Sequence, residues 1–140
     1  MVKKIVGRNE YVSIPELNFF NIKAKIDTGA YSGSIHCNKI HLNENGTVQF
    51  NLLDESHKDY TDKQIDMPIS NIKKVKSSNG TVEERIFVEL KIELFGKLYL
   101  TELSLTDRKD MKVPMLLGRK FLKKRFTVDV SLKYQILNKE

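Results

Sequence analysis

Asp27, followed by Thr28 and Gly29, stands at the end of an alternating stretch of the sequence, residues 22–26. Isoleucine, alanine and isoleucine alternate there with two lysines, which is the period-2 pattern of a half-buried strand. Burial disfavours the ionised form of a carboxylate, so an acid placed there usually has a partner or a chemical task. Two such carboxylates about 3 Å apart can share a proton and activate a water molecule. Asp27 is therefore our candidate catalytic residue, and the alternative is an ordinary turn aspartate that accepts hydrogen bonds from its own loop.

Few other residues in the chain have types and spacing suited to catalysis or metal binding. His36, Cys37 and His41 are near one another, and His57 lies in a polar segment. The sequence has no His-Glu-x-x-His, no paired Cys-x-x-Cys and no Gly-x-x-x-x-Gly-Lys-Ser/Thr loop. We therefore predict no metal site, no ATP site and no cofactor, and we interpret the single cysteine as a small buried apolar residue.

Length and charge limit the possible classes of protein. The 140 residues suit a single domain, 1–140, and 24 basic against 18 acidic residues give 24 − 18 = +6. Because the lysines are scattered without interleaved aromatic residues, we predict a solvated basic surface and no nucleic-acid partner. No secretory signal follows Lys3 and Lys4, and no apolar run approaches the roughly 20 residues of a membrane span. We therefore expect a cytoplasmic location and no membrane partner, and the one cysteine also favours the cytosol.

Strands with one short helix account for the rest of the chain. We predict an opening hairpin from residues 2–6 and 11–14, a solvated loop at 54–66, and a brief helix at 119–125. Alternation at 86–94 predicts a long antiparallel strand, and a shift of apolar parity after it predicts a bulge near Thr101. The remaining predicted strands are 48–52, 72–76, a segment from Val82 onward, a return strand that begins at Leu98, 126–130 and 132–136. Residues 113–117 are predicted to be a short buried run.

One hairpin tip has a strong local signal. Asn79 and Gly80 form the Asn-Gly pair that is typical of a tight turn between strands, and Ser77 and Ser78 precede them.

Two motifs together resemble a known family. The run of Ile26, Asp27, Thr28, Gly29 and Ala30, followed by the stretch at 115–122, resembles the retropepsin-like aspartic proteases. Ser34, His36 and further matches at 77–80, 84–85, 105–108 and 128–129 resemble one bacterial branch, often labelled "ATP-dependent zinc protease". That branch is found associated with RimK-type ATP-grasp glutamate ligases. The resemblance covers nearly the whole chain and implies an all-β, retropepsin-like closed β-barrel with one short α-helix.

The resemblance also implies roles for individual residues. The chain has one Asp-Thr-Gly, so a carboxylate pair requires a homodimer, in which Asp27 of each copy acts on a peptide or protein substrate. Thr28 would hydrogen-bond across the two-fold axis, Gly29 would bring its N–H to the carboxylate, and Ala30 would keep the cleft floor small. Gly118 would pass behind the aspartate loop. Arg119 would stabilise the fold by pairing with a buried acid such as Asp107.

The hairpin tip at Ser78, Asn79 and Gly80 would be a flap over the cleft, although an ordinary surface hairpin is an equal alternative. The ligase association implies a second possible function. In that case the chain is a non-catalytic module that binds an ATP-grasp glutamate ligase or its polyglutamylated target, and the basic surface suits an acidic tail.

Overall fold

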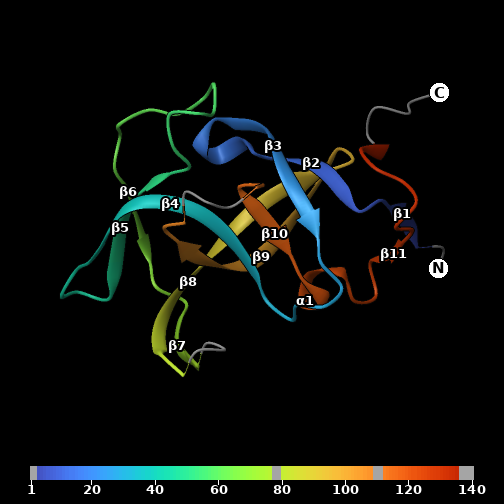
Figure 1. The fold of residues 1–140 in the computed structure, drawn as a ribbon. Helices are drawn as coiled ribbons and strands as arrows, with labels where there is room; N and C mark the ends of the chain where they lie inside the picture. Colours follow the sequence, from blue (N-terminus) through green and yellow to red (C-terminus); the bar gives the residue numbers. More distant parts are fainter. Residues whose placement is uncertain (1–2, 77–79, 109–111, 136–140) are drawn as a thin grey trace.

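The computed structural model describes residues 3–76, 80–108 and 112–135. No helix within these ranges is long and apolar enough to cross a membrane. The elements follow one another along the chain (Figure 1) as β1 (Lys4–Val6), β2 (Asn9–Ile14), a 3-10 turn (Pro15–Leu17), β3 (Phe19–Ile26), β4 (Gly33–Leu42), β5 (Thr47–Leu52), β6 (Ile65–Pro68), β7 (Asn71–Lys76), β8 (Val82–Leu94), β9 (Lys97–Thr106), β10 (Met115–Leu117), α1 (Arg119–Leu122) and β11 (Phe126–Val128).

Six strands close into a β-barrel in the order β10, β3, β2, β8, β9 and β4. The barrel closes because β4 pairs with β10 as well as with β9. The pairs β3–β10 and β4–β9 are parallel, whereas β2–β3 and β8–β9 are antiparallel. Strands β5 and β6 extend the sheet beyond β4, and β7 forms a hairpin with β8. The predicted all-β barrel with one short helix is confirmed.

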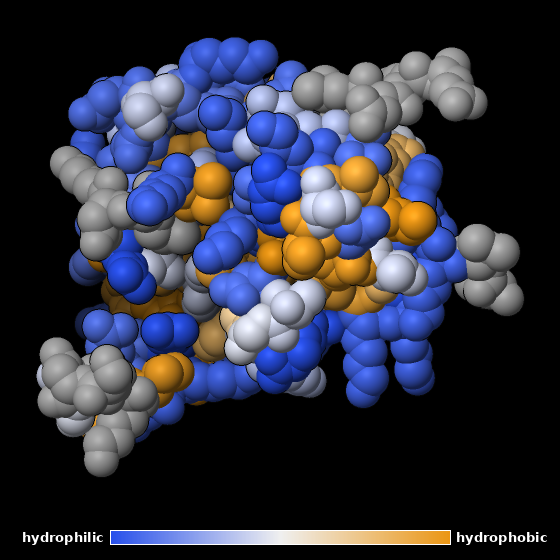
Figure 2. Space-filling model, turned by 45° about the vertical axis from the view of Figure 1, so that its right-hand side comes forward, coloured by the Kyte–Doolittle hydropathy of each residue, from blue (hydrophilic) through white to orange (hydrophobic). Residues whose placement is uncertain are grey.

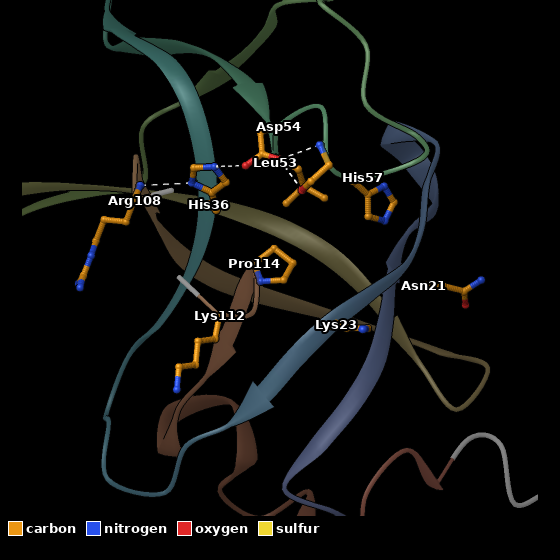
Figure 3. A pocket seen from close by; sticks show the side chains of 10 residues that line it. Asn21, Lys23, His36, Leu53, Asp54, His57, Arg108, Lys112 and Pro114 are labelled. Carbon is orange, nitrogen blue, oxygen red and sulfur yellow. Dashed lines mark hydrogen bonds and ion pairs between the residues drawn. The ribbon is translucent and has the colours of Figure 1, made fainter. Parts of the chain in front are cut away.

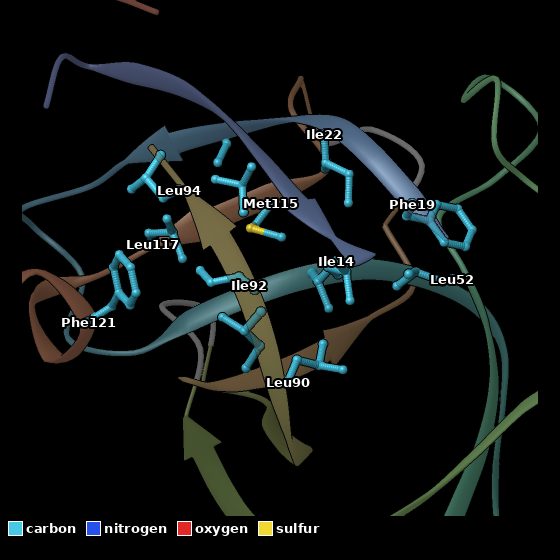
Figure 4. Packing of buried hydrophobic residues seen from close by; sticks show 14 of the residues in the cluster. Ile14, Phe19, Ile22, Leu52, Leu90, Ile92, Leu94, Met115, Leu117 and Phe121 are labelled. Atoms are coloured by element: carbon cyan, nitrogen blue, oxygen red, sulfur yellow. The ribbon is translucent and has the colours of Figure 1, made fainter. Parts of the chain in front are cut away.

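Apolar side chains at alternate strand positions fill the barrel (Figure 4). Leu90, Ile92 and Leu94 of β8 are completely buried, as are Met115 and Leu117 of β10. Each such side chain contributes about 1.5–3 kcal/mol relative to an exposed one. The filled interior therefore fixes the strands whose ends position the candidate site. On the face shown in Figure 2, a broad apolar area lies right of the centre, and smaller apolar areas lie among the hydrophilic side chains to its left.

The N-terminal strand pairs differently from the prediction. Strand β1 pairs in parallel with β11, so the expected opening hairpin with β2 is wrong. Gly7 lies against the backbone of Leu132, where an added Cβ atom would be 2.5 Å from its carbonyl carbon. The buried Glu10 carboxylate accepts hydrogen bonds from the N–H of Gly7 at 2.7 Å and of Gln135 at 2.8 Å. These contacts turn the chain after β1 toward the C-terminal segment.

Three further predictions are corrected by the structure. The β8–β9 register runs without a shift, so no bulge occurs at Thr101. The apolar residues change from even to odd positions because Leu98 and Leu100 lie on the outer face of β9, where they are 55% and 54% exposed. The helix ends at Leu122 because the next residue, Lys123, has a non-helical ψ of 130°, and Lys124 then has a positive φ of 66°. No strand forms at 129–135.

The polar segment at 54–66 is confirmed as a loop as far as residue 64, since β6 starts at Ile65.

Candidate active site

Asp27 lies in the first turn after β3, where the parallel neighbour β10 fixes its backbone. Ile26 is aligned with Leu117, and the N–H of Asp27 donates to the Leu117 carbonyl oxygen at 2.9 Å. Ile26 is buried, whereas Asp27 is half-buried, because the alternation of β3 turns the aspartate outward. The carboxylate thus lies at the outer end of a strand whose position is set by the core.

The carboxylate of Asp27 closes a short turn on itself. Its Oδ1 atom accepts a hydrogen bond from the N–H of Gly29 at 2.9 Å, and the Asp27 carbonyl oxygen accepts from Ala30 N–H at 3.3 Å. A Cβ atom on Gly29 would lie 3.2 Å from Oδ1, so glycine allows this close approach. An ordinary turn aspartate would make the same local contacts, and the roles of Thr28, Gly29 and Ala30 in catalysis stay predictions.

Gly118 closes the other side of this loop, where β10 passes into α1. A Cβ atom there would lie 2.7 Å from the carbonyl oxygens of Ala30 and Tyr31 and 2.8 Å from that of Ser32. The first backbone N–H groups of α1 donate to the same loop, from Arg119 to Ala30 at 2.8 Å and from Lys120 to Tyr31 at 2.9 Å. The two motifs of the sequence are therefore in direct contact.

The side chain of Arg119 has a different partner from the predicted one. Its Nη1 atom donates to the Thr28 carbonyl oxygen at 3.0 Å, and its guanidinium lies 5.8 Å from the Tyr31 ring centroid. Asp107 is exposed, and no ion pair within the described ranges joins it to Arg119. The separation has a simple cause: Asp107 follows the part of β9 aligned with His36, well along β4 from the aspartate loop. Arg119 thus supports the loop directly through its carbonyl.

The expected flap is the hairpin of β7 and β8. The two strands pair from Asn71 opposite Phe87 to Lys76 opposite Val82. Gly80 has a φ of +86°, as the tight turn requires. Ser78 and Asn79 lie outside the described residues, so their assignment stays a prediction.

A cavity of about 290 Å³ is lined by this hairpin and by the barrel. Glu83 and Arg85 of β8 line it from one side, and Lys25, Ser34 and Leu116 line it from the other. The hairpin therefore borders a hollow that reaches the strand leading to the candidate aspartate.

A second cavity, of about 310 Å³, surrounds the buried His36 (Figure 3). His36 Nε2 lies 2.8 Å from Asp54 Oδ2, and the Arg108 N–H donates to Nδ1 at 3.2 Å. His36 Nδ1 also lies 3.2 Å from the Thr106 carbonyl oxygen, so this ring nitrogen faces one donor and one acceptor. Hydrogen bonds from the Ser56 hydroxyl and N–H keep the pKa of Asp54 below its usual range. Asp54 therefore remains ionised next to the imidazole.

The two cavities share Arg108 and Lys112 in their linings. Lys23 lines the His36 cavity and Lys25 lines the other, and both point outward from β3 as Asp27 does. Asp27 lines neither cavity and follows Ile26, the last residue of β3. At about 3.3 Å per residue, Lys25 precedes Asp27 by about 7 Å and Lys23 by about 13 Å along the chain. We call the joined linings of the two cavities, with their lysines and arginines, the cationic channel.

The residues weighed as metal ligands have separate surroundings. Cys37 is completely buried in the core, and this burial raises the pKa of its thiol. His41 is exposed, and the His57 ring lies 5.8 Å from the ring of Phe19. No group of three potential ligands gathers in the described part of the chain.

The sequence analysis missed the channel formed by lysines and arginines. Alternation along β3 places Lys23 and Lys25 on the face of Asp27, and that pattern is visible in the sequence. The local sequence does not predict the contact of His36 with Asp54, because that contact depends on strand pairing. The same holds for the presence of Arg108 and Lys112 in both linings.

Comparison with known proteins identifies the family. The model of the RimB-like family, described as the retropepsin-like aspartic endopeptidase RimB, matches residues 5–139. The chain belongs to this family. The family match includes both motifs that meet at the aspartate loop of this RimB-like chain.

Relatives and a solved structure agree with the RimB-like assignment. Proteins named "Probable alpha-L-glutamate ligase" are 32% identical over 136 residues in Desulfotalea psychrophila and 33% over 132 residues in Shewanella halifaxensis. The matches cover 94% and 92% of this chain but 29% of each relative, so the chain spans less than a third of their length. A crystal structure of a Legionella pneumophila protein of unknown function matches with a TM-score of 0.75 and 28% identity, covering 95% of this chain and 98% of that one.

Proposed function

We propose that this chain is an aspartic endopeptidase that acts as a homodimer through two copies of Asp27. The observation that carries the proposal is the double support of the aspartate loop. The N–H of Asp27 is fixed on Leu117, and the loop packs against Gly118 from behind. A loop fixed on both sides suits preorganised catalysis, because catalytic groups must keep their geometry through the reaction.

The proposed chemistry needs one proton shared between two carboxylates. The ionised Asp27 removes a proton from a water molecule as that water attacks the peptide carbonyl. The protonated Asp27 of the second copy hydrogen-bonds the carbonyl oxygen and stabilises the charge that develops there. Proton transfer to the leaving amine then breaks the C–N bond. Thr28 would hydrogen-bond across the two-fold axis, and Ala30 would leave room in the cleft.

The proposed flap would exclude water from this reaction. In a homodimer, the β7–β8 hairpin with Ser78, Asn79 and Gly80 at its tip would cover the substrate. The cavity beneath the described part of the hairpin, lined by Arg85 and Lys25, is where a substrate backbone would lie.

The basic channel supports a preference for acidic peptides. Its cations are Lys23, Lys25, Arg85, Arg108 and Lys112, which outnumber the two acids of the same linings, Asp54 and Glu83. Carboxylate side chains along an extended substrate would find an attractive potential there. The relatives named as glutamate ligases point in the same direction, and we propose that a glutamate-rich chain is the substrate and an ATP-grasp glutamate ligase a partner.

A second candidate function uses the same channel without chemistry. The chain would then bind a glutamate ligase or its glutamylated product as an accessory module. The cationic channel supports the accessory module as much as it supports the protease. Binding of an acidic chain requires only charge complementarity and not a second Asp27.

Asp27→Asn separates these two functions. The carboxamide keeps the size and the turn contact of the side chain but cannot serve as the base, so hydrolysis should disappear. Cleavage of glutamate-rich peptides and sedimentation of both forms would be measured, with Asp62→Asn as an exposed control. Loss of cleavage with the dimer and the melting temperature unchanged supports the protease. Undetectable cleavage by the wild type together with tight peptide binding supports the accessory module.

A further inference from the structure

A third concave surface shares no lining residue with the two cavities near the candidate active site. It has a volume of about 420 Å³ and lies among the start of β1, the β8–β9 turn and the segment after α1. Five cations line this basic groove: Lys3, Lys4, Lys97, Lys124 and Arg125. Two aromatic side chains, Phe95 and Tyr99, complete the lining, and none of its residues is acidic.

Three of the five cations of the basic groove lie over aromatic rings. Lys4 Nζ lies 4.8 Å from the Phe95 ring centroid, and Lys97 Nζ lies 5.6 Å from that of Tyr99. The Arg125 guanidinium lies 5.4 Å from the Tyr99 centroid. Within residues 3–76, 80–108 and 112–135, none of the five cations forms an ion pair with an acid. Their charge is therefore available to an anionic ligand.

The floor of the groove is an aromatic cluster fixed by the core. Tyr99 meets Phe121 and Phe126 edge-on, with both centroid distances 5.6 Å, and Phe95 lies 6.5 Å from Phe126. Phe121 and Phe126 are buried, whereas Phe95 and Tyr99 are half-buried. The two lining rings thus have fixed positions and still present part of their surface to the groove.

We propose that the basic groove binds single-stranded nucleic acid. Phosphates would contact the five cations, and one base would replace an ammonium group over Phe95 or Tyr99 and stack on the ring. Positive grooves with aromatic platforms are the general means of binding single strands. The volume lies in the usual range of ligand cavities, roughly 300–1,000 Å³, which suits a nucleotide and is too small for a duplex.

A nucleic acid suits the groove better than an acidic peptide does. Carboxylates would use the cations alone, whereas a nucleotide uses both the cations and the rings. The sequence predicted no nucleic-acid partner because its lysines are scattered. Folding brings cations from three distant segments, 3–4, 97 and 124–125, around two rings. This inference goes beyond the proposed function, since it does not require Asp27 to be catalytic.

The test is binding of a fluorescein-labelled oligouridylate of about ten nucleotides, followed by anisotropy between about 50 and 200 mM salt. The double variant Lys97→Glu/Lys124→Glu should lose at least about tenfold in affinity. Its plot of log affinity against log salt should flatten by about 1.4, because two phosphate contacts are lost. Phe95→Leu keeps every charge and should lose about fivefold or more through stacking alone.

Lys58→Glu/Lys63→Glu is the matched control, since it makes the same change of net charge at two exposed positions of the 54–64 loop. It should bind within about twofold of the wild type, and so should Asp27→Asn. Equal losses in both double variants would overturn the proposal, because net charge alone would then explain binding. A larger loss of poly-L-glutamate binding than of oligonucleotide binding in Lys97→Glu/Lys124→Glu would also overturn it and assign the groove to acidic proteins. Absence of oligonucleotide binding at the lowest salt would do the same.

Discussion

Gly118 packs directly against the carbonyl oxygen of Ala30, with room for a hydrogen atom and none for a methyl group. An added Cβ atom would lie 2.7 Å from that oxygen, closer than real Cβ atoms approach. The start of α1 is therefore pressed onto the loop that carries Asp27. Backbone contact of this kind cannot relax by a side-chain rotation, so the helix start and the aspartate loop have to move together.

Gly118→Ala should disturb this contact. We expect a loss of about 1–3 kcal/mol in the free energy of unfolding, because the loop or α1 must shift to admit the methyl group. Peptide cleavage should fall by more than the unfolded fraction explains, since the shift reaches Asp27. Urea titration and activity would be measured on the same samples. Gly46→Ala, in an exposed turn with a φ of +82°, is the control that strains the backbone far from the site. Full activity in Gly118→Ala would contradict this coupling.

Cleavage should depend on pH with a maximum between two limits. Two Asp27 carboxylates that share a proton are inactive when both are protonated and also when both are ionised, so the rate falls on each side. Initial rates for one peptide would be followed from acid to neutral pH, with sedimentation at each end to verify the dimer. A rate that is constant over this range and sensitive to a chelator would contradict the carboxylate pair and indicate a metal mechanism.

The cationic channel should determine which peptides bind. Lys23→Gln/Lys25→Gln removes two charges next to the aspartate loop but leaves the core of β3 unchanged, because both side chains are exposed. We expect KM for a glutamate-rich peptide to rise about tenfold, with a smaller change for a neutral peptide. Lys58→Gln/Lys63→Gln makes the same charge change in the exposed loop. If that control raises KM equally, overall charge and not the channel attracts the substrate.

Asp54 should stabilise the fold in a pH-dependent way. Its pKa in the folded chain is lowered by Ser56, so its contribution is present above about pH 4 and is lost as the pH falls through the folded-state pKa. Asp54→Asn should therefore lose about 1–3 kcal/mol at neutral pH and less in acid. Urea titrations at pH 7 and pH 3 measure the difference. Asp62→Asn, whose ion pair with Lys39 is exposed at 3.7 Å, should change stability little at either pH.

Local patterns predicted the elements that carry the candidate site. The alternation ending at Ile26 predicted a half-buried strand that runs into Asp27, and the alternation at 86–94 predicted the long strand β8. Both are confirmed, because burial of every second side chain depends only on the period of a strand. The resemblance of the two motifs to a known family predicted the closed barrel. Hydrophobic periodicity alone predicts strands but does not specify how they pair.

The sequence by itself thus determined the barrel of strands, the place of Asp27 at a strand end and the outward direction of Lys23 and Lys25. Only the tertiary structure decided that β1 pairs with β11 and that distant lysines meet around Phe95 and Tyr99. It also decided that the Arg119 side chain donates to the Thr28 carbonyl oxygen and does not pair with Asp107. The physical reason is range. Side-chain periodicity acts between neighbours in the chain, whereas pairing and convergence of charge depend on which distant segments the closed sheet brings together.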